Sequence, residues 1–201
     1  MSAGAFVSRG GLKLAHALAT FGIDARGLVC ADFGCSTGGL TDCLLQAGAA
    51  RVYAIDTAYG QLAWTLRNDP RVTVLERTNA LHARPPADLA AAGGVDLVVA
   101  DLGWTPQKLL IPAALKWIKP AGRIITLIKP HYELKAADPA RLPRGGVLDE
   151  SLSAQVTQET LAAMAALGVR VISTTPSPIL GGEHKGKGTG NVEVLALVER
   201  G

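Results

Sequence analysis

Short apolar stretches alternate along the chain with longer stretches of helical periodicity. The apolar stretches predict strands at residues 28–33, 51–56, 72–76, 95–100, 122–129, 169–175 and 191–198. The longer stretches predict helices at residues 10–21, 38–47, 60–67, 106–118 and 151–167. This alternation indicates an α/β fold with a mostly parallel sheet and helices on both faces. The last two strands have no helix between them, so we expect them to form an antiparallel pair at one edge.

Two long connecting segments interrupt this alternation. Residues 130–149 and 176–190 are rich in proline, glycine and basic side chains. Connectors of this length in a compact domain are usually functional or irregular. In the second segment, His184, Lys185 and Lys187 are candidates for contacts with phosphate groups, and an ordinary solvated loop is the alternative.

The composition indicates one globular domain, covering residues 1–201. Of the 201 residues, 48% are hydrophobic, and the net charge is +3. This mildly basic balance permits a nucleic-acid partner without requiring one. The three cysteines lack paired spacing, which argues against a disulfide framework or a zinc site, and we expect no metal. No apolar run is long enough to cross a membrane and the N-terminus has no apolar signal core, so we expect a cytoplasmic protein.

A glycine-rich loop follows the first strong strand and begins a helix. It has the sequence DFGCSTGG over residues 32–39, and Asp56 ends the next strand 22 residues after Gly34. Glycines let the backbone approach a ligand closely, and a carboxylate at Asp56 suits the two hydroxyls of a ribose. The spacing matches neither a dinucleotide fingerprint nor a Walker A loop. The loop therefore predicts an adenosine ligand without a pyrophosphate, such as S-adenosylmethionine; the alternative is an ordinary strand–turn–helix corner.

Two charged residues end central strands beside this loop. Asp101 follows the fourth predicted strand and Lys129 ends the fifth, so both lie at the edge where α/β sheets bind ligands. Desolvation favours the neutral form of a lysine, which can take a proton from a hydroxyl. Asp101 would orient this lysine. The simpler alternatives are a solvated charge for Lys129 and a helix or turn cap for Asp101.

Two further charged residues stand in apolar surroundings near the ends of the sequence. Lys13 borders the apolar stripe of the first predicted helix, and Glu193 lies in the final predicted strand. A buried carboxylate requires a partner, which makes a lysine contact plausible. The alternatives are a surface lysine whose stem covers apolar neighbours and a solvated glutamate on an edge strand.

Six long motifs stand out along the chain: VSRGGLKLAHAL (7–18), DFGCSTGGLTDCLLQAGAARVYAID (32–56), YGQLAWTLRNDPRVTVLERTNA (59–80), VDLVVADL (95–102), LIKPHYE (127–133) and GNVEVL (190–195). In these motifs the chain resembles the FtsJ-like RNA methyltransferases, specifically their hemolysin-A (TlyA-type) branch. The motifs cover most of the chain in the order of the family, so chance is not a serious explanation.

The resemblance implies a fold, a cofactor and a reaction. The fold is Rossmann-like, with the seven-stranded sheet of class I methyltransferases, and the cofactor is S-adenosylmethionine. The reaction implied is 2′-O-methylation of ribose in RNA, most plausibly ribosomal RNA. A catalytic Lys-Asp-Lys-Glu tetrad falls on Lys13, Asp101, Lys129 and Glu193. The predicted cofactor residues are Asp32, Gly34, Cys35, Ser36, Thr37, Gly38, Gly39, Asp56, Thr57, Asn79 and Asp101.

The chain also departs from the pattern of this family. A small RNA-binding domain normally precedes the VSRGG motif, and we expect this chain to lack it. Gly103 and Trp104 stand where the family has Ser-Phe-like residues, and Trp104 is expected either to stack on a flipped nucleotide or to fill the core. The insertion GGEHKGKGTG before Asn191 is longer than the usual loop.

Other functions remain as alternatives. A cytolysin is one, because related proteins carry the hemolysin name, although the sequence has no signal peptide, membrane span or long amphipathic helix. A methyltransferase for a small-molecule hydroxyl is another, because a fold does not determine a substrate. A binding module without catalysis is a third, but all four tetrad positions are occupied.

Overall fold

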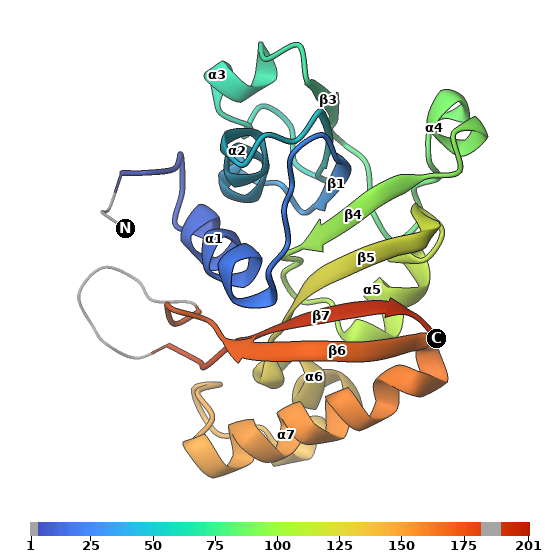
Figure 1. Cartoon of the computed structure of the whole chain (residues 1–201). Helices are drawn as coiled ribbons and strands as arrows, with labels where there is room; N and C mark the ends of the chain where they lie inside the picture. The colour runs from blue at the N-terminus through green and yellow to red at the C-terminus, as the bar shows by residue number, and fades with distance from the viewer. Residues whose placement is uncertain (1–3, 182–189) are drawn as a thin grey trace.

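Seven strands form one mixed sheet with helices on both faces (Figure 1). The computed structural model describes residues 4–181 and 190–201. The strands are β1 (Val29–Phe33), β2 (Arg51–Ile55), β3 (Val72–Leu75), β4 (Val95–Ala100), β5 (Ile118–Ile128), β6 (Val169–Pro176) and β7 (Val194–Arg200). The helices are α1 (Gly10–Phe21), α2 (Gly39–Gln46), α3 (Trp64–Arg67), α4 (Ala87–Ala91), α5 (Gln107–Ala114), α6 (Pro130–Ala137) and α7 (Glu150–Ala163), with 3₁₀ turns η1 (Pro139–Arg141) and η2 (Met164–Leu167).

The order of the strands is β3-β2-β1-β4-β5-β7-β6. The first five strands in this order are mutually parallel, whereas β7 pairs antiparallel with both β5 and β6. The expected antiparallel pair at one edge is therefore confirmed, and so is the predicted α/β class. The carboxyl ends of β1, β2, β4 and β5 consequently meet at one edge of the sheet, where open α/β folds bind ligands.

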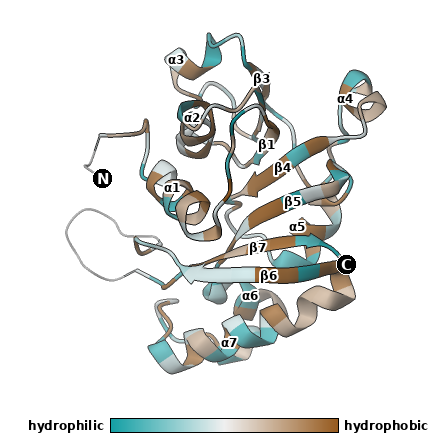
Figure 2. Ribbon diagram, viewed as in Figure 1, coloured by the Kyte–Doolittle hydropathy of each residue, from teal (hydrophilic) through white to brown (hydrophobic). Residues whose placement is uncertain are grey.

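The core has two layers because successive strand residues point to opposite faces of the sheet. On one face, Cys30 and Val52 pack beneath α1 and α2; on the other, Phe33 and Ile55 pack toward α4 and α5. Trp117 is fully buried on this second face, with its ring 5.6 Å from that of Phe33. Hydrophobic colour accordingly runs through the central strands in Figure 2, while α7 carries polar residues along its length.

Several predicted boundaries were wrong, for local reasons. The helix predicted at 60–67 is reduced to Trp64–Arg67, because Ala63, directly before it, takes a non-helical backbone conformation with ψ 139°. The helix predicted at 106–118 ends at Ala114, and β5 begins earlier than expected, at Ile118. Residues 130–149 are not simply a loop, because Pro130 starts α6. At the first position of a helix the backbone N–H has no partner inside the helix, so proline, which lacks this group, is well tolerated there. The short helix α4 was not predicted.

Candidate active site

A cavity of about 740 Å³ opens at the carboxyl ends of the parallel strands. The glycine loop after β1 and the end of β2 line one part of it, and the ends of β4 and β5 with the start of α1 line the other. The predicted residues that line the cavity are Lys13, Gly34, Cys35, Ser36, Thr37, Gly39, Asp56, Thr57, Asn79, Asp101 and Lys129. Asp32, Gly38 and Glu193 were also predicted as site residues but do not line it.

The glycine loop passes close to the turn after β4. Gly34 has φ 85°, and a Cβ at this position would lie 2.9 Å from Leu102 Cδ2 and 3.2 Å from the Asp101 carbonyl oxygen. The amide of Gly34 donates to the Ile55 carbonyl at 2.9 Å, which connects the loop to the end of β2. A side chain at residue 34 would therefore push the glycine loop away from the turn after β4, so a glycine is required for these two segments to approach each other closely.

Asp56 is held rigidly at the end of β2. Its Oδ2 accepts a hydrogen bond from the Ser36 amide and its Oδ1 accepts one from the Ala58 amide, each at 2.8 Å. A carboxylate has about four lone-pair sites, so both oxygens keep acceptor capacity toward the cavity. This geometry suits the two hydroxyls of a ribose, and the cavity beside it has room for an adenosine.

Asp32 lies behind the glycine loop rather than in the cavity. Its side chain is fully buried, and Oδ2 accepts a hydrogen bond from the Thr41 hydroxyl at 2.7 Å. Within the described part of the chain, Oδ1 has no hydrogen-bond partner. Burial raises the pKa of Asp32 to about 7, although the Thr41 bond lowers it. Asp32 thus connects the end of β1 to α2 through Thr41 and does not line the cavity.

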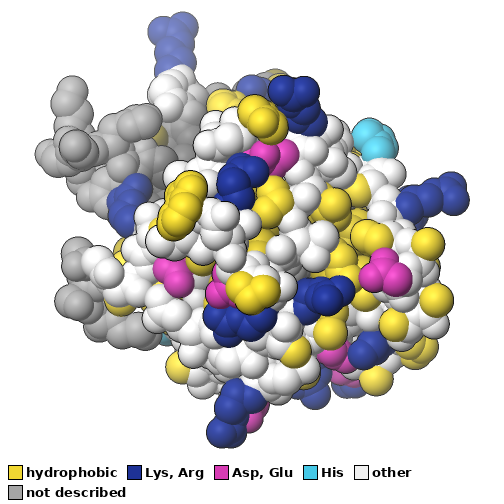
Figure 3. All heavy atoms as spheres, turned by 90° about the horizontal axis from the view of Figure 1, so that it is seen from above, with side chains coloured by type: hydrophobic (Ala, Val, Ile, Leu, Met, Phe, Trp, Pro, Cys, Tyr) yellow, Lys and Arg dark blue, Asp and Glu magenta, His cyan; other side chains and the backbone are white. Residues whose placement is uncertain are grey.

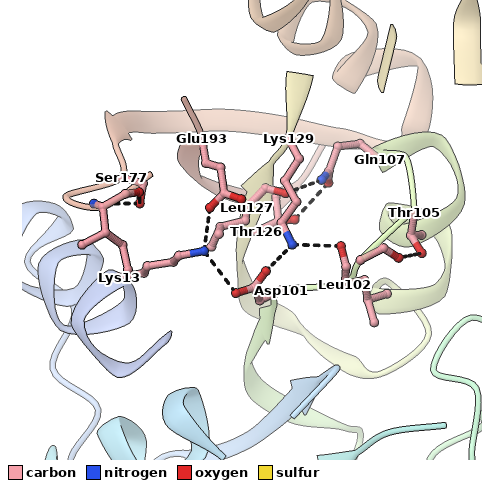
Figure 4. A network of polar contacts seen from close by, with 12 residues as sticks. Lys13, Asp101, Leu102, Thr105, Gln107, Thr126, Leu127, Lys129, Ser177 and Glu193 are labelled. Carbon is pink, nitrogen blue, oxygen red and sulfur yellow. Dashed lines mark hydrogen bonds and ion pairs between the residues drawn. The ribbon is translucent and has the colours of Figure 1, made fainter. Parts of the chain in front are cut away.

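Four charged side chains from distant parts of the sequence form one connected network (Figure 4). Lys13 Nζ lies 2.6 Å from Glu193 Oε2 and 3.5 Å from Asp101 Oδ2. Lys129 Nζ pairs with the other oxygen of Asp101 and donates to the Leu102 carbonyl at 3.2 Å. Asp101 therefore bridges the two lysines, and its contacts are those of an ion pair rather than of a helix cap.

All four of these side chains are largely buried. Their exposed fractions are 10% for Lys13, 18% for Asp101, 11% for Lys129 and 4% for Glu193. The solvated alternatives for the lysines and for Glu193 are therefore wrong. Glu193 precedes β7, which lies between β5 and β6 and is not an edge strand.

The two lysines determine the electrostatics of the network. Burial alone would raise the pKa of Asp101, but Lys129 and then Lys13 outweigh it and lower the pKa below its usual value. Burial and the neighbouring charge of Lys129 lower the pKa of His131 to about 4. Asp101 is therefore ionised and His131 neutral at pH 7, so the imidazole adds no positive charge beside Lys129.

Close backbone packing brings Lys13 into the network. A Cβ on Gly39 would lie 2.9 Å from the amide nitrogen of Gly11 and would also collide with Ser8, so the start of α1 rests directly on the start of α2. The Val7 amide donates to Asp42 Oδ2 at 2.8 Å, which holds the preceding segment on α2. Gly39, predicted as a cofactor residue, thus also positions α1.

The segment from residue 177 to residue 181 fixes the position of Glu193 through backbone hydrogen bonds to residues 191 and 193. The Ser177 amide donates to the Glu193 carbonyl at 2.8 Å, and Gly181 and Asn191 exchange backbone hydrogen bonds. A Cβ on Gly181 would collide with the Glu193 carboxylate. The candidates His184, Lys185 and Lys187 lie outside the described residues.

An exposed tryptophan stands at the rim of the cavity. Trp104 lines the cavity, and 75% of the residue is exposed, which excludes the core alternative. Its ring centroid lies 4.9 Å from that of Tyr132, and Lys135 Nζ lies 5.1 Å from the Trp104 ring centroid. Its φ of 58° is left-handed, which is unusual for a bulky residue. The turn after β4 therefore presents this ring outward.

Two polar residues near Lys129, the buried Gln107 and the partly buried Glu133, were not predicted from the sequence. Gln107 is 2% exposed, and its backbone N–H donates to Glu133 Oε1 at 2.8 Å. Burial raises the pKa of Glu133 to about 7, although the Gln107 N–H bond and Lys108 lower it. Gln107 begins a helix that is apolar from Leu109 onward, and a polar residue just ahead of this apolar segment is the signal in the sequence that could have found it.

Comparison with known proteins supports the assignment that the geometry suggests. The family model of FtsJ-like methyltransferases matches residues 6–186. The chain is 43% identical to the 16S/23S rRNA (cytidine-2′-O)-methyltransferase TlyA of Mycobacterium tuberculosis, covering 94% of this chain and 66% of that protein. It is 34% identical to Hemolysin A of Brachyspira hyodysenteriae, and the match covers 95% of this chain and 75% of that protein. A solved structure described as a hemolysin from Streptococcus thermophilus is 35% identical, with a TM-score of 0.87, and the match covers 99% of this chain and 68% of the other chain.

The chain belongs to the FtsJ-like methyltransferase family. Membership confirms the predicted Rossmann-like methyltransferase fold and its cofactor, S-adenosylmethionine. The described part of the chain has no helix that is both long enough and apolar enough to cross a membrane. The chain spans about two thirds of the length of the TlyA protein that it matches.

Proposed function

We propose that this protein methylates a ribose 2′-hydroxyl of ribosomal RNA. The observation that carries the proposal is the placement of Lys129 Nζ on Asp101, at the end of a cavity whose other end is formed by the glycine loop and Asp56. The TlyA relative, with its rRNA 2′-O-methyltransferase name, supports ribosomal RNA as the acceptor.

S-adenosylmethionine, when bound, would supply the methyl group: the bond from the methyl carbon to sulfur would break as the bond to the 2′-oxygen forms, leaving S-adenosylhomocysteine as the product. Gly34, Ser36, Asp56 and Asn79 would hold its adenosine half, because they line the same end of the cavity. In its neutral form, after its own extra proton has passed to solvent, Lys129 Nζ takes the proton of the 2′-hydroxyl, acting as a general base. Asp101 holds that nitrogen in place and, as an anion, offsets positive charge at the site.

The other lysine has a different role. Lys13 shares Asp101 with Lys129 but is also paired with Glu193 at 2.6 Å. Lys13 Nζ lies between the carboxylates of Asp101 and Glu193, so its hydrogen bonds hold it in a fixed position and Lys13 is suited to orient the ribose oxygen rather than to take its proton. The two lysines are therefore not interchangeable, although both contact the same carboxylate.

Trp104 supplies a surface for the base of the target nucleotide. Its ring is exposed at the rim and is supported from behind by Tyr132. Stacking of a base on an aromatic ring contributes roughly 1–3 kcal/mol. Lysine and arginine side chains are spread over the face shown in Figure 3, with apolar side chains between them, rather than joined in one block. RNA binding would then depend on separate phosphate contacts, in keeping with the net charge of +3.

The test is label transfer from methyl-labelled S-adenosylmethionine to unmodified ribosomal subunits, followed by digestion to nucleosides. We expect labelled 2′-O-methyl ribose with the wild type and a rate about 10²–10⁴-fold lower with Lys129→Ala. The matched control is Lys119→Ala, because Lys119 lies near the start of the same strand and pairs with Asp96. Cofactor binding without label in any RNA nucleoside would refute the proposal.

The small-molecule alternative uses the same assay. Label that appears on an added small alcohol but not on RNA would favour it. The cavity does not itself distinguish the two acceptors, whereas the TlyA relationship and the exposed Trp104 favour RNA.

A further inference from the structure

A buried glutamine joins the turn that carries Asp101 to the strand that carries Lys129. Gln107 Nε2 donates to the Leu127 carbonyl at 2.9 Å, and the Thr126 hydroxyl donates to Gln107 Oε1 at 3.0 Å. Gln107 and Thr126 are 2% and 0% exposed. Figure 4 shows this side chain reaching from the start of α5 to the end of β5, beside Lys129.

These contacts lie where the sheet no longer holds β5 on one side. The last pair between β4 and β5 joins Ala100 to Thr126, whereas pairing with β7 continues to Ile128. Gln107 therefore supplies a hydrogen bond to β5 directly beyond the end of its pairing with β4. Without this hydrogen bond, the buried Leu127 carbonyl oxygen would lose its donor, and water cannot replace that donor at a buried position.

A second contact holds the other side of Lys129. The backbone amide of Gln107 donates to Glu133 Oε1, and the Glu133 amide in turn donates to the Lys129 carbonyl at 3.1 Å. Gln107 thus contacts residues 126 and 127 before the lysine and residue 133 after it. The turn between Asp101 and Gln107 is consequently fixed to both sides of Lys129.

We propose that Gln107 is a positioning residue for the methyl transfer, holding the Asp101–Leu102 turn at hydrogen-bonding distance from Lys129. The proposal rests on the proposed function, because it takes Lys129 as the base. A base displaced by about 1 Å loses up to about 100-fold in rate. Gln107 itself contacts neither substrate nor cofactor, so it should affect kcat and leave cofactor affinity unchanged.

The test is a double-mutant cycle in the label-transfer assay. Gln107→Met keeps the volume but removes both polar contacts, and we expect kcat to fall about 10- to 100-fold with the Kd for S-adenosylmethionine within twofold of wild type. In a Lys129→Ala background the same change should cost nothing further, because the base that it positions is gone. An equal fractional loss in both backgrounds, or an unchanged kcat in the first, would overturn the proposal.

Two further variants separate positioning from general stability. Leu89→Ala removes a buried side chain of α4, and it should lower the Tm while leaving kcat unchanged. If Gln107→Met fails to fold, Glu133→Met replaces it, with Glu133→Gln as the conservative variant. Glu133→Met should lower kcat and Glu133→Gln should restore it, because the glutamine keeps the Oε1 acceptor. Equal kcat in these two variants would count against the proposal.

One measurement does not depend on methylation. Crystal structures of the wild type and Gln107→Met give the separation between Lys129 Nζ and the Leu102 carbonyl oxygen, which is 3.2 Å here. A separation beyond hydrogen-bonding range in the variant supports the positioning role, and an unchanged separation overturns it. If the wild type methylates no RNA, the proposed function fails while this comparison still decides the role of Gln107.

Discussion

Removing the charge of Glu193 should destabilise the protein strongly, because it leaves a buried lysine without its closest partner. In Glu193→Gln, the amide oxygen can still accept a hydrogen bond, but Lys13 loses the negative charge 2.6 Å away at a site where Glu193 and Lys13 are only 4% and 10% exposed. Breaking a buried ion pair by removing one partner typically costs about 3–5 kcal/mol. Asp101 remains at 3.5 Å from Lys13, so we expect the lower end, about 3 kcal/mol.

Urea denaturation followed by circular dichroism at pH 7.5 measures this change. The matched control is Arg170→Met, which breaks the ion pair with Glu199, a β7 residue. Because Arg170 is 69% exposed, this loss should stay below about 1 kcal/mol. The double variant Lys13→Met with Glu193→Leu removes both charges and should recover most of the lost stability. A Glu193→Gln protein within about 0.5 kcal/mol of wild type would refute the reasoning, because such a value is typical of surface substitutions.

Three other predictions address the cofactor, the nucleotide and pH. Asp56→Ala should weaken S-adenosylmethionine binding about 10- to 100-fold in calorimetry, since each hydrogen bond to a charged group contributes roughly 1.5–3 kcal/mol; unchanged affinity would remove Asp56 from the ribose site. Trp104→Ala should raise the KM for RNA about 5- to 150-fold, the equivalent of one lost stacking contact, while Trp104→Phe should stay near wild type; equal KM values for the two variants would contradict stacking. In the folded state, the pKa of Asp32 is raised from 3.8 to about 7. Between these pH values the folded state keeps a proton that the unfolded state loses. The contribution of Asp32 to the free energy of unfolding therefore falls as the pH rises from about 4 to about 7, by at most about 4 kcal/mol. The fall should be smaller in Asp32→Asn across urea titrations at pH 4 to 8, and identical slopes would show that Asp32 does not titrate in this range.

The central sheet was predictable because its strands are buried on both faces. A buried parallel strand such as β4 is a continuous apolar run, and its bounds in the structure, Val95–Ala100, are those predicted. The first helix was predicted with equal accuracy, over Gly10–Phe21. Predicted boundaries were wrong where the backbone conformation of one residue overrides the periodicity, as at Ala63, whose non-helical ψ of 139° prevents the helix from starting before Trp64.

The candidate site was predictable to the extent that its residues stand at strand ends. Asp101 and Lys129 could be placed from the pattern alone, because β4 and β5 are parallel and end at the same edge. Lys13 and Glu193 depended on the family resemblance, since helical and strand patterns do not report which faces meet across the fold. Gln107 was missed for the same reason: its role depends on where the pairing of β4 with β5 stops, and periodicity does not contain that information.

The pairing of Lys13 with Glu193 has a consequence for how the protein becomes active during synthesis. These residues are 180 positions apart in the sequence and come from α1 and from the segment that leads into β7. A contact between such distant residues forms late, because the chain between them must first be ordered. β7 also inserts between β5 and β6, so the sheet is incomplete until this strand has left the ribosome. We therefore expect a nascent chain stalled before residue 193 to transfer no methyl group, and release of the completed chain to start the activity.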